Sequence, residues 1–342
     1  MERQPFGRRP PTLRDIAVRA GASISTVSRA LRGDQRISAR TRQRIVEIAQ
    51  RLGYRADVAG SLLRASKPRV VGLLCDLSQE LHVAYRHEVL QCAEQAGFRV
   101  VVESVEGQGP PRAALRRLRE FRIQALVVVD PRCLGDAGDP GAPVVVIGQE
   151  RPFADADLVT SDNGTGMGEA VEWLAGLGHR GITYVDGPPG ASARARRAAA
   201  VAAARGAGAP LRVVPGGADL DSGFLAARSM VDEAGAGRPL PSAVMCYNDQ
   251  CAHGLIIALL RAGLVPGRDV SVIGFDNSRI AATRALSIAS VDRRPAEVAR
   301  HAVDLARARA LGDEPPPRAV RVDTALVRRG SVGPPPAPGA QS

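Results

Sequence analysis

Residues 12–57 read TLRDIAVRAGASISTVSRALRGDQRISARTRQRIVEIAQRLGYRAD, and this stretch decides the fold of the N-terminal part of the chain. Thr12 can cap a helix, and Asp15 follows three residues later, as in a capping box. Apolar residues then recur at helical spacing until Gly21, whose freedom at positive φ suits the end of a helix. The stretch therefore begins with a short helix that is closed by a glycine turn.

Two further helices are expected after this turn. The second spans residues 23–31, and its outer face carries Ile24, Ser25, Ser28 and Arg29. The third begins near Ser38 and stops at Gly53. Two short helices around a glycine turn, braced by a third, are typical of a helix-turn-helix unit, whose second helix enters the major groove of DNA. The alternative is a small three-helix bundle with no role in DNA binding.

The distribution of charge separates these two readings. The whole chain of 342 residues has a net charge of +11. Residues 1–69 contain sixteen Lys and Arg against five Asp and Glu, which is also +11, so the remainder of the chain is neutral. A basic block confined to one fifth of the chain is the electrostatic footprint of a nucleic-acid-binding module.

Composition indicates a globular protein of more than one domain, with 45% hydrophobic and 24% charged residues. No apolar run is long enough to span a bilayer, and no apolar stretch follows the N-terminal arginines as it would in a signal peptide. We therefore expect a cytoplasmic protein. The five cysteines lack the spacing of a metal or redox site, so we expect reduced thiols and neither metal nor cofactor.

From residue 70 onward, apolar runs alternate with helical patterns. Strands are expected over 70–75, 99–103, 125–129, 144–147, 181–185, 211–214, 243–246 and 271–274. Helices are expected over 85–96, 112–121, 167–177, 193–205, 223–233 and 250–261. This alternation predicts an α/β core of doubly wound parallel sheets, and the number of strands is sufficient for two lobes.

Residues 12–57 closely resemble the DNA-binding head of the LacI/GalR family of repressors, through S-x-x-T-V-S-R at residues 23–29 and the closing L-G-Y. The resemblance implies that Ile24, Ser25 and Arg29 read bases. It also implies that Ser23, Thr26 and Ser28 contact phosphates. The expected DNA-binding residues are completed by Thr12, by Arg32, which stands where the family usually has Asn, and by Leu63.

In this family the segment that matches residues 56–69 is a hinge helix that folds on operator DNA, and Leu63 corresponds to the leucine that wedges into the minor groove. The chain departs from the family pattern at Ala56, Asp57, Gly60 and Ser61. A glycine inside a short helix costs about 1 kcal/mol relative to alanine. We therefore expect a weakened hinge, and the alternative is a plain flexible linker.

The resemblance continues through the core, as V-T-S-D-N at 159–163, G-H-R-G-I at 178–182, N-D at 248–249 and D-V-S-V-I-G-F-D at 269–276. It implies two lobes of periplasmic-binding-protein type with a small ligand between them. The expected effector-binding residues are His82, Arg196, Asn248, Asp276 and Arg293.

Some of these assignments leave alternatives open. The match to Arg196 could slip to Arg194 or Arg197, because Ala199 replaces a glycine of the family pattern. Arg293 replaces a glutamine, and a cation there favours an acidic or phosphorylated sugar, although a solvated arginine is the other reading. A lone His82 is more often incidental. Asp162 and Asp249 are expected to be structural carboxylates rather than ligands.

The predicted organisation is a disordered basic tail (1–11), a helix-turn-helix domain (12–55), a hinge (56–69), a two-lobed effector-binding core (70–331) and a disordered tail (332–342). We predict a non-enzymatic transcriptional regulator, a repressor that binds palindromic operator DNA as a homodimer under allosteric control by a sugar-like ligand. A periplasmic binding protein would lack the basic head. An enzyme is suggested only by the glycine-rich residues 163–168, which lack the G-x-G-x-x-G spacing and the P-loop lysine and follow no strong buried strand.

Overall fold

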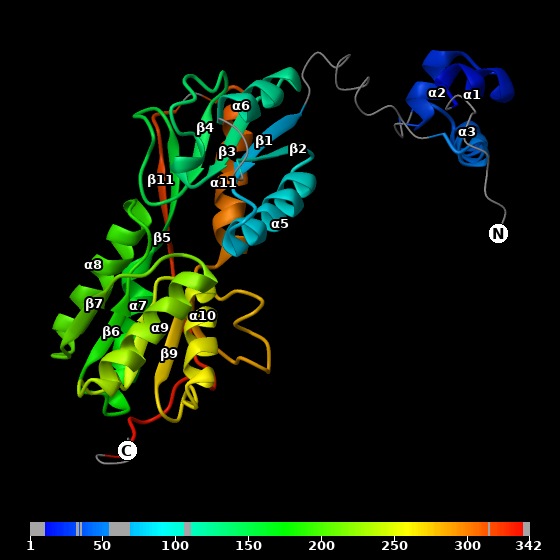
Figure 1. Cartoon of the computed structure of the whole chain (residues 1–342). Coiled ribbons are helices and arrows are strands. Elements are labelled where there is room, and N and C mark those ends of the chain that lie inside the picture. Colours follow the sequence, from blue (N-terminus) through cyan, green and yellow to red (C-terminus); the bar gives the residue numbers. More distant parts are fainter. Residues whose placement is uncertain are drawn as a thin grey trace. The chain divides into compact units, whose positions relative to one another are not determined.

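The computed structural model describes residues 11–31, 34, 36–54, 69–105, 111–313 and 315–337. It divides into two compact units, residues 1–67 and 68–342 (Figure 1). Arg32, Leu63, the N-terminal tail up to residue 10 and almost the whole expected hinge lie outside the described residues. The predictions made for them therefore stay predictions.

The described residues of the first unit form the helices α1 (Leu13–Ala20), α2 (Ile24–Leu31) and α3 (Ala39–Leu52). The predicted capping box is present: the Asp15 amide donates to the Thr12 hydroxyl, and the Thr12 amide donates to the Asp15 carboxylate. Gly21 and Gly53 end α1 and α3 at φ values of 59° and 66°. One apolar cluster joins the three helices, formed by Ile16, Ala17, Ala20, Val27, Ala30, Ile45, Ile48 and Ala49.

The second unit contains two lobes, each built on a six-stranded sheet (Figure 1). The first sheet is wholly parallel, in the order β11-β5-β4-β3-β1-β2. Its strands are β1 (Val70–Cys75), β2 (Arg99–Ser104), β3 (Ala125–Val129), β4 (Val144–Ile147), β5 (Asp157–Asp162) and β11 (Ala319–Asp323). The helices of this lobe are α5 (Glu80–Gln95), α6 (Pro111–Glu120) and α11 (Pro295–Ala310), with a 3-10 turn, η1 (Pro131–Cys133). Helices α5 and α11 share one apolar cluster with this sheet.

The second sheet has the order β12-β10-β9-β8-β6-β7 and is parallel except for β12, which runs antiparallel to β10. Its strands are β6 (Ile182–Val185), β7 (Leu211–Val214), β8 (Ala243–Cys246), β9 (Ser271–Phe275), β10 (Ala289–Asp292) and β12 (Ala325–Val327). One face is covered by α9 (Leu220–Gly235) and α10 (Asp249–Arg261), and the other by α7 (Asn163–Gly176) and α8 (Ala191–Gly206). Helix layers on both faces confirm the predicted doubly wound α/β architecture.

The chain passes between the lobes three times: after β5, after β10, and between β11 and β12. The glycine-rich residues 163–168 form the start of α7 at the first crossing. A Cβ on Gly166 would lie 2.3 Å from Val291 and 2.8 Å from the Thr324 hydroxyl, both at the other two crossings. Close packing of the three connections therefore accounts for the glycine at 166, with no need for a bound phosphate.

All eight strands expected from the sequence are present, with ends shifted by at most one residue. The sequence reasoning missed β5, β10, β11, β12 and α11. Residue 163 does follow a strand, since β5 ends at Asp162, but this strand is not the strong buried strand whose absence the sequence indicated. β5 alternates buried and half-buried residues, and β12 has three half-buried residues, so neither forms the continuous apolar run of a central parallel strand.

The expected boundary of the core at residue 331 was also too early. Val332 packs against the second lobe, and Gly333 donates its amide to the Ser271 hydroxyl at 3.1 Å. Its carbonyl oxygen lies 2.9 Å from Nε2 of buried His179, whose Nδ1 lies 2.9 Å from the Ser242 hydroxyl. Because a carbonyl can only accept, Nε2 carries the proton and Nδ1 accepts from Ser242. His179 thus ties residue 333 to the second sheet.

Among the described residues, no helix is long and apolar enough to cross a membrane.

Candidate functional site

The outer face of α2 is open to solvent, as the sequence predicted. The Ile24 side chain is 49% exposed, and Ser25 and Arg29 are also exposed, while Thr26 and Ser28 are half-buried. A large apolar side chain on an otherwise polar, basic helix face does not contribute to the core of this small unit. The face therefore presents an apolar contact, hydroxyls and one guanidinium to whatever lies against it.

Ser23 and Thr12 hold the starts of α2 and α1. The Thr26 amide donates to the Ser23 hydroxyl at 3.0 Å, and the Ser23 hydroxyl also lies 2.7 Å from that of Ser25. Thr12 is engaged with Asp15 in the capping box. Both residues are thus helix caps whose local role is visible in the structure, and phosphate contact would be an additional role for them.

A cleft of about 380 Å³ lies in the second unit and is lined by residues of both lobes. All five residues expected to bind the effector line it: His82, Arg196, Asn248, Asp276 and Arg293. Polar side chains that the sequence reasoning did not single out line it as well, namely Asp76, Tyr85, Asp130, Arg132 and Tyr247.

The cleft lies at the carboxyl ends of the parallel strands. Asp76 follows β1, Asp130 follows β3, and Asp276 follows β9, each directly after a fully buried strand. Ligands of open α/β sheets bind at this edge, because strand-end side chains and the starts of helices converge there. A polar residue at the end of an apolar strand is the signal in the sequence that could have identified Asp76 and Asp130.

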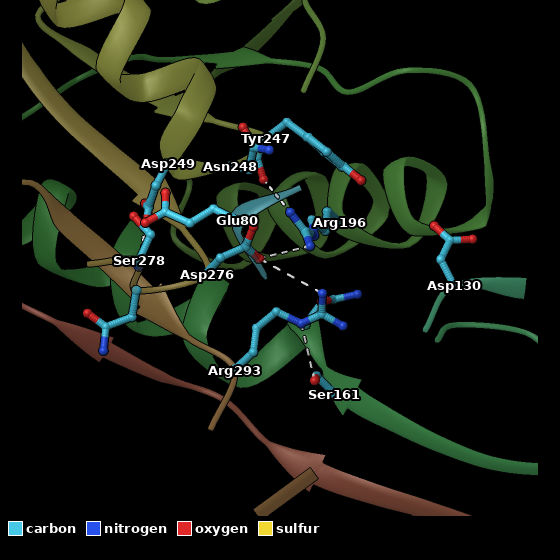
Figure 2. A network of polar contacts seen from close by, with 12 residues as sticks. Glu80, Asp130, Ser161, Arg196, Tyr247, Asn248, Asp249, Asp276, Ser278 and Arg293 are labelled. Carbon is cyan, nitrogen blue, oxygen red and sulfur yellow. Dashed lines mark hydrogen bonds and ion pairs between the residues drawn. The ribbon is translucent and has the colours of Figure 1, made fainter. Parts of the chain in front are cut away.

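Arg196, from α8, is joined to Asp276 in the floor of the cleft (Figure 2). Arg196 Nη2 donates to Asp276 Oδ1 at 3.0 Å, and Nη1 donates to the Tyr247 carbonyl at 2.6 Å. The guanidinium also stacks 4.2 Å from the ring centre of Phe275 and 4.4 Å from that of Tyr247. Burial, the largest single influence, would by itself lower the pKa of Arg196, but the Asp276 carboxylate and the neighbouring tyrosines together outweigh it and the pKa is raised. Arg196 therefore stays charged and is held rigidly in place.

Arg293, which follows β10, approaches the same carboxylate from the other side (Figure 2). Its Nη1 lies 3.9 Å from Asp276 Oδ1, and its Nε donates to the Ser161 hydroxyl at 3.2 Å. The Arg293 guanidinium lies 5.8 Å from the ring centre of Tyr85. One carboxylate thus serves two buried guanidiniums.

Two aspartates of the cleft have a positive backbone φ angle. Asp276 has φ of 105° and Asp130 has φ of 66°, a region that non-glycine residues seldom occupy. Such conformations cost on the order of 1–3 kcal/mol and cluster at functional sites. The strain at these two strand ends marks them as positions where the direction of the side chain matters.

Asn248 lines the cleft but has a structural task as well. Its Oδ1 accepts from the Cys251 amide at 2.9 Å, capping α10, and its Nδ2 donates to the Ala218 carbonyl at 2.9 Å. Asn248 Oδ1 can therefore accept one more hydrogen bond from a ligand, and Nδ2 can donate one more.

Asp249 is buried and does not line the cleft. It accepts from the Ser278 amide at 2.6 Å and from the Ser290 hydroxyl at 2.7 Å. Burial, with the Asp276 charge second, raises the pKa of Asp249 to about 7. The contacts agree with the structural role expected for Asp249. Asp162 likewise caps α7 through the Gly164 amide.

His82 is neutral at physiological pH, because burial lowers its pKa to about 4. Its Nδ1 accepts from the Asp76 amide at 3.1 Å, so the proton resides on Nε2. Beside it, Asp130 and Arg132 form a two-point ion pair with Arg132 Nη2 2.7 Å from Asp130 Oδ2. Burial opposes ionisation of Asp130, yet the hydrogen bonds from Arg132 leave its pKa below the ordinary value.

The geometry also separates the three candidate arginines of α8. Arg196 lines the cleft and is buried, whereas Arg194 pairs with Glu150 at 3.4 Å and Arg197 pairs with Asp186, both with half-exposed or exposed side chains. Arg196 is therefore the arginine placed to meet a ligand.

A helix-turn-helix unit followed by a two-lobed α/β unit with a polar cleft defines the class of ligand-responsive DNA-binding regulators. Residues 12–57 match the family described as bacterial regulatory proteins, lacI family, and residues 171–332 match the periplasmic binding protein-like domain. The chain therefore carries the helix-turn-helix domain of the lacI family of regulators together with a periplasmic binding protein-like domain, and this confirms the predicted resemblance.

Several known proteins are similar to it along most of their length. The chain is 29% identical to the HTH-type transcriptional regulator PtxS of Pseudomonas putida over 94% of this chain and 96% of that protein. It is 29% identical to the lactose operon repressor of Escherichia coli over 79% of this chain and 76% of the repressor. A solved structure of the lac repressor bound to ONPG in the repressed state superposes with a TM-score of 0.77 at 25% identity, covering 94% of this chain and all of that one. These relatives are regulators rather than enzymes.

Proposed function

We propose that this chain is a cytoplasmic repressor that binds a palindromic operator as a homodimer and is controlled allosterically by a sugar or sugar derivative held between its two lobes. The observation that carries the proposal is the convergence of Arg196, Asp276 and Arg293 in the cleft. Arg196 comes from α8, 80 or more residues before Asp276 and Arg293, which follow β9 and β10, and all three are largely buried. Charged side chains that are buried together in a cleft mark it as a candidate functional site.

On the DNA side, α2 would enter the major groove with Ile24, Ser25 and Arg29 toward the bases. Arginine paired with guanine is the commonest specific contact there. The remaining proposed DNA contacts are Thr12, Ser23, Thr26, Ser28, Arg32 and Leu63. The dimer is supported by a lac repressor dimer of the same fold, which was solved bound to operator.

On the effector side, carboxylates and guanidiniums suit a ligand with several hydroxyls, because they bind neighbouring oxygens in pairs. A ligand that touches both lobes would bind one arrangement of the lobes better than another. Only this difference in affinity can change binding to the operator.

The test is operator binding measured by fluorescence anisotropy at fixed salt, with and without each of a panel of sugars and sugar phosphates. We expect one ligand to change the operator Kd at least about fivefold, the lower end of usual allosteric coupling. Arg293→Gln, which leaves the Arg196–Asp276 pair in place, should weaken the ligand effect and retain operator binding, while the control Arg194→Gln, outside the cleft, should behave as wild type. Failure to bind any palindromic DNA above the nonspecific level would refute the proposal.

A further inference from the structure

We propose that the effector is a hydroxyl-bearing acid whose carboxylate or phosphate binds the Arg293 guanidinium, while its hydroxyls meet Asp76 and Asp130 elsewhere in the cleft. This inference rests on the proposed function, because it takes the cleft to be the effector site. It narrows the ligand class from sugars in general to those that carry an oxyanion.

Around Arg293 the cleft has more buried positive charge than negative charge. Arg196 and Arg293 share the single carboxylate of Asp276, and the side chains of all three are at least 91% buried. Arg196 has the closer pairing, at 3.0 Å against 3.9 Å for Arg293, and the Tyr247 carbonyl satisfies its other arm. One buried positive charge is therefore left without a full partner, and buried charges require one.

The contacts of Arg293 support the same conclusion. Its Nε donates to the neutral Ser161 hydroxyl, and the carboxylate oxygen with which it pairs, Asp276 Oδ1, lies 3.9 Å from Nη1, beyond hydrogen-bond distance. The guanidinium thus has donors turned to a cleft that it lines. Asp249 does not supply the missing charge there, because its oxygens are taken up by Ser278 and Ser290 and it lies outside the cleft lining.

An unpartnered hydroxyl beside Arg293 is the second, independent observation. Tyr85 lines the cleft, is 1% exposed, and its hydroxyl has no hydrogen-bond partner among the residues that the structure describes. A buried hydroxyl without a partner costs on the order of 1–3 kcal/mol. A ligand oxyanion at Arg293 offers lone pairs that could satisfy both the guanidinium and this phenol, because charge-assisted hydrogen bonds to oxyanions are the strong ones.

The cleft also has acceptors for hydroxyls, on residues of the first lobe. Asp76 uses Oδ1 for the Ser78 amide and hydroxyl, at 3.0 and 2.7 Å, and no contact of its Oδ2 is present within the described part of the chain. Asp130 is paired with Arg132, so this pair adds no net charge. Neutral His82 lies near Asp76 and Asp130, and its protonated Nε2 can donate to a ligand oxygen. The cleft therefore offers both a guanidinium for an oxyanion and acceptors for hydroxyls.

Acetate and inorganic phosphate carry the two proposed anionic groups without a sugar. They can therefore test the oxyanion site at Arg293 before the natural effector is known. Thermal unfolding of the full-length protein is followed by the fluorescence of Trp173, the single tryptophan of the chain, which lies in the second lobe. At constant ionic strength, we expect phosphate or acetate to raise the unfolding midpoint saturably in the wild type. Arg293→Gln should lose the effect, Arg293→Lys should keep part of it, and Arg194→Gln, whose side chain lies off the cleft, should keep all of it.

A second arm identifies which acid is used. Binding of glucose, gluconate, glucuronate and glucose 6-phosphate, and of the galactose series, is measured by calorimetry. An acid of either kind should bind at least about tenfold more tightly than its neutral parent, and Arg293→Gln should remove that preference. Carboxylates and phosphates are distinguished by which acid binds.

The inference is overturned if neither phosphate nor acetate shifts the wild-type midpoint, or if Arg293→Gln responds like the wild type. It is equally overturned if a neutral sugar binds and its acid does not. None of these outcomes touches operator binding, so a protein that binds its operator but ignores oxyanions refutes this inference alone. A protein that binds oxyanions at Arg293 but no operator refutes the proposed function instead.

Discussion

The shared carboxylate of Asp276 predicts an unequal response to two substitutions of the same ion pair. Arg196→Met leaves Asp276 with Arg293 at 3.9 Å, whereas Asp276→Asn leaves two buried guanidiniums with no carboxylate. At an effective dielectric constant of 20, Coulomb's law gives about 5 kcal/mol of attraction at 3.0 Å and about 4 kcal/mol at 3.9 Å. Arg196→Met forfeits the first attraction, and Asp276→Asn forfeits both.

The net cost of breaking a buried pair is typically about 3–5 kcal/mol, because the partner left behind is desolvated. We therefore expect Arg196→Met to lower the free energy of unfolding by about 3 kcal/mol, near the bottom of that range, since Arg293 still compensates Asp276. Asp276→Asn should cost about 5 kcal/mol or more, because nothing compensates Arg196 and Arg293. The order of the two variants is the sharper part of the prediction.

Urea unfolding followed by Trp173 fluorescence measures both values, since the tryptophan lies in the lobe that contains Arg196 and Asp276. Arg194→Met is the matched control: its pair with Glu150 is exposed, so it should change stability by no more than about 0.5 kcal/mol. If Arg196→Met proved as damaging as Asp276→Asn, or if both cost less than about 1 kcal/mol, the shared-carboxylate reasoning would be wrong.

Three further predictions concern packing, pH and capping. Gly254→Ala should destabilise the second lobe by about 2 kcal/mol or more in urea unfolding, the usual cost of an overpacked core, because the added Cβ would lie 1.9 Å from the Leu220 carbonyl oxygen. The control Gly168→Ala, in an open position on α7, should be neutral or stabilise the lobe by about 1 kcal/mol. The pKa of His82 is 6.5 in the unfolded chain but about 4 in the folded protein, so lowering the pH through this range favours unfolding. Between pH 6.5 and 4 the free energy of unfolding of the wild type should fall by up to about 3 kcal/mol more than that of His82→Gln. Parallel pH profiles of the two proteins would contradict this. Thr12→Ala should lower the stability of the helix-turn-helix unit by about 1 kcal/mol in circular-dichroism melts, and an unchanged melt would rule out a contribution from the capping box.

Local chemistry could be predicted from the sequence wherever neighbouring residues decide the structure. The Thr12–Asp15 capping box and the turns at Gly21 and Gly53 need only residues within a few positions, and the structure has them as expected. The buried central strands were predicted for the same reason, because a continuous apolar run of four to six residues is a local pattern.

Elements and contacts that depend on distant residues could not be predicted in this way. β11 exposes most of its residues and is defined by pairing with β5, more than 150 residues earlier. Arg196 meets a carbonyl 51 residues away and a carboxylate 80 residues away. The resemblance to a family supplied Arg196 and Asp276, but the unpartnered hydroxyl of Tyr85 follows from packing alone.

The central claim is that the basic head reads a specific DNA sequence. Its most direct test is selection of binding sites from random DNA with the full-length protein, followed by measurement of affinity for the selected site and for a scrambled one at physiological salt. We predict a palindromic site bound at least about a thousandfold more tightly than scrambled DNA. Arg29→Ala should sharply reduce that ratio, and removal of residues 1–69, which carry all the net positive charge, should abolish binding. Enrichment of no palindrome, or equal affinity for both sequences, would contradict the account.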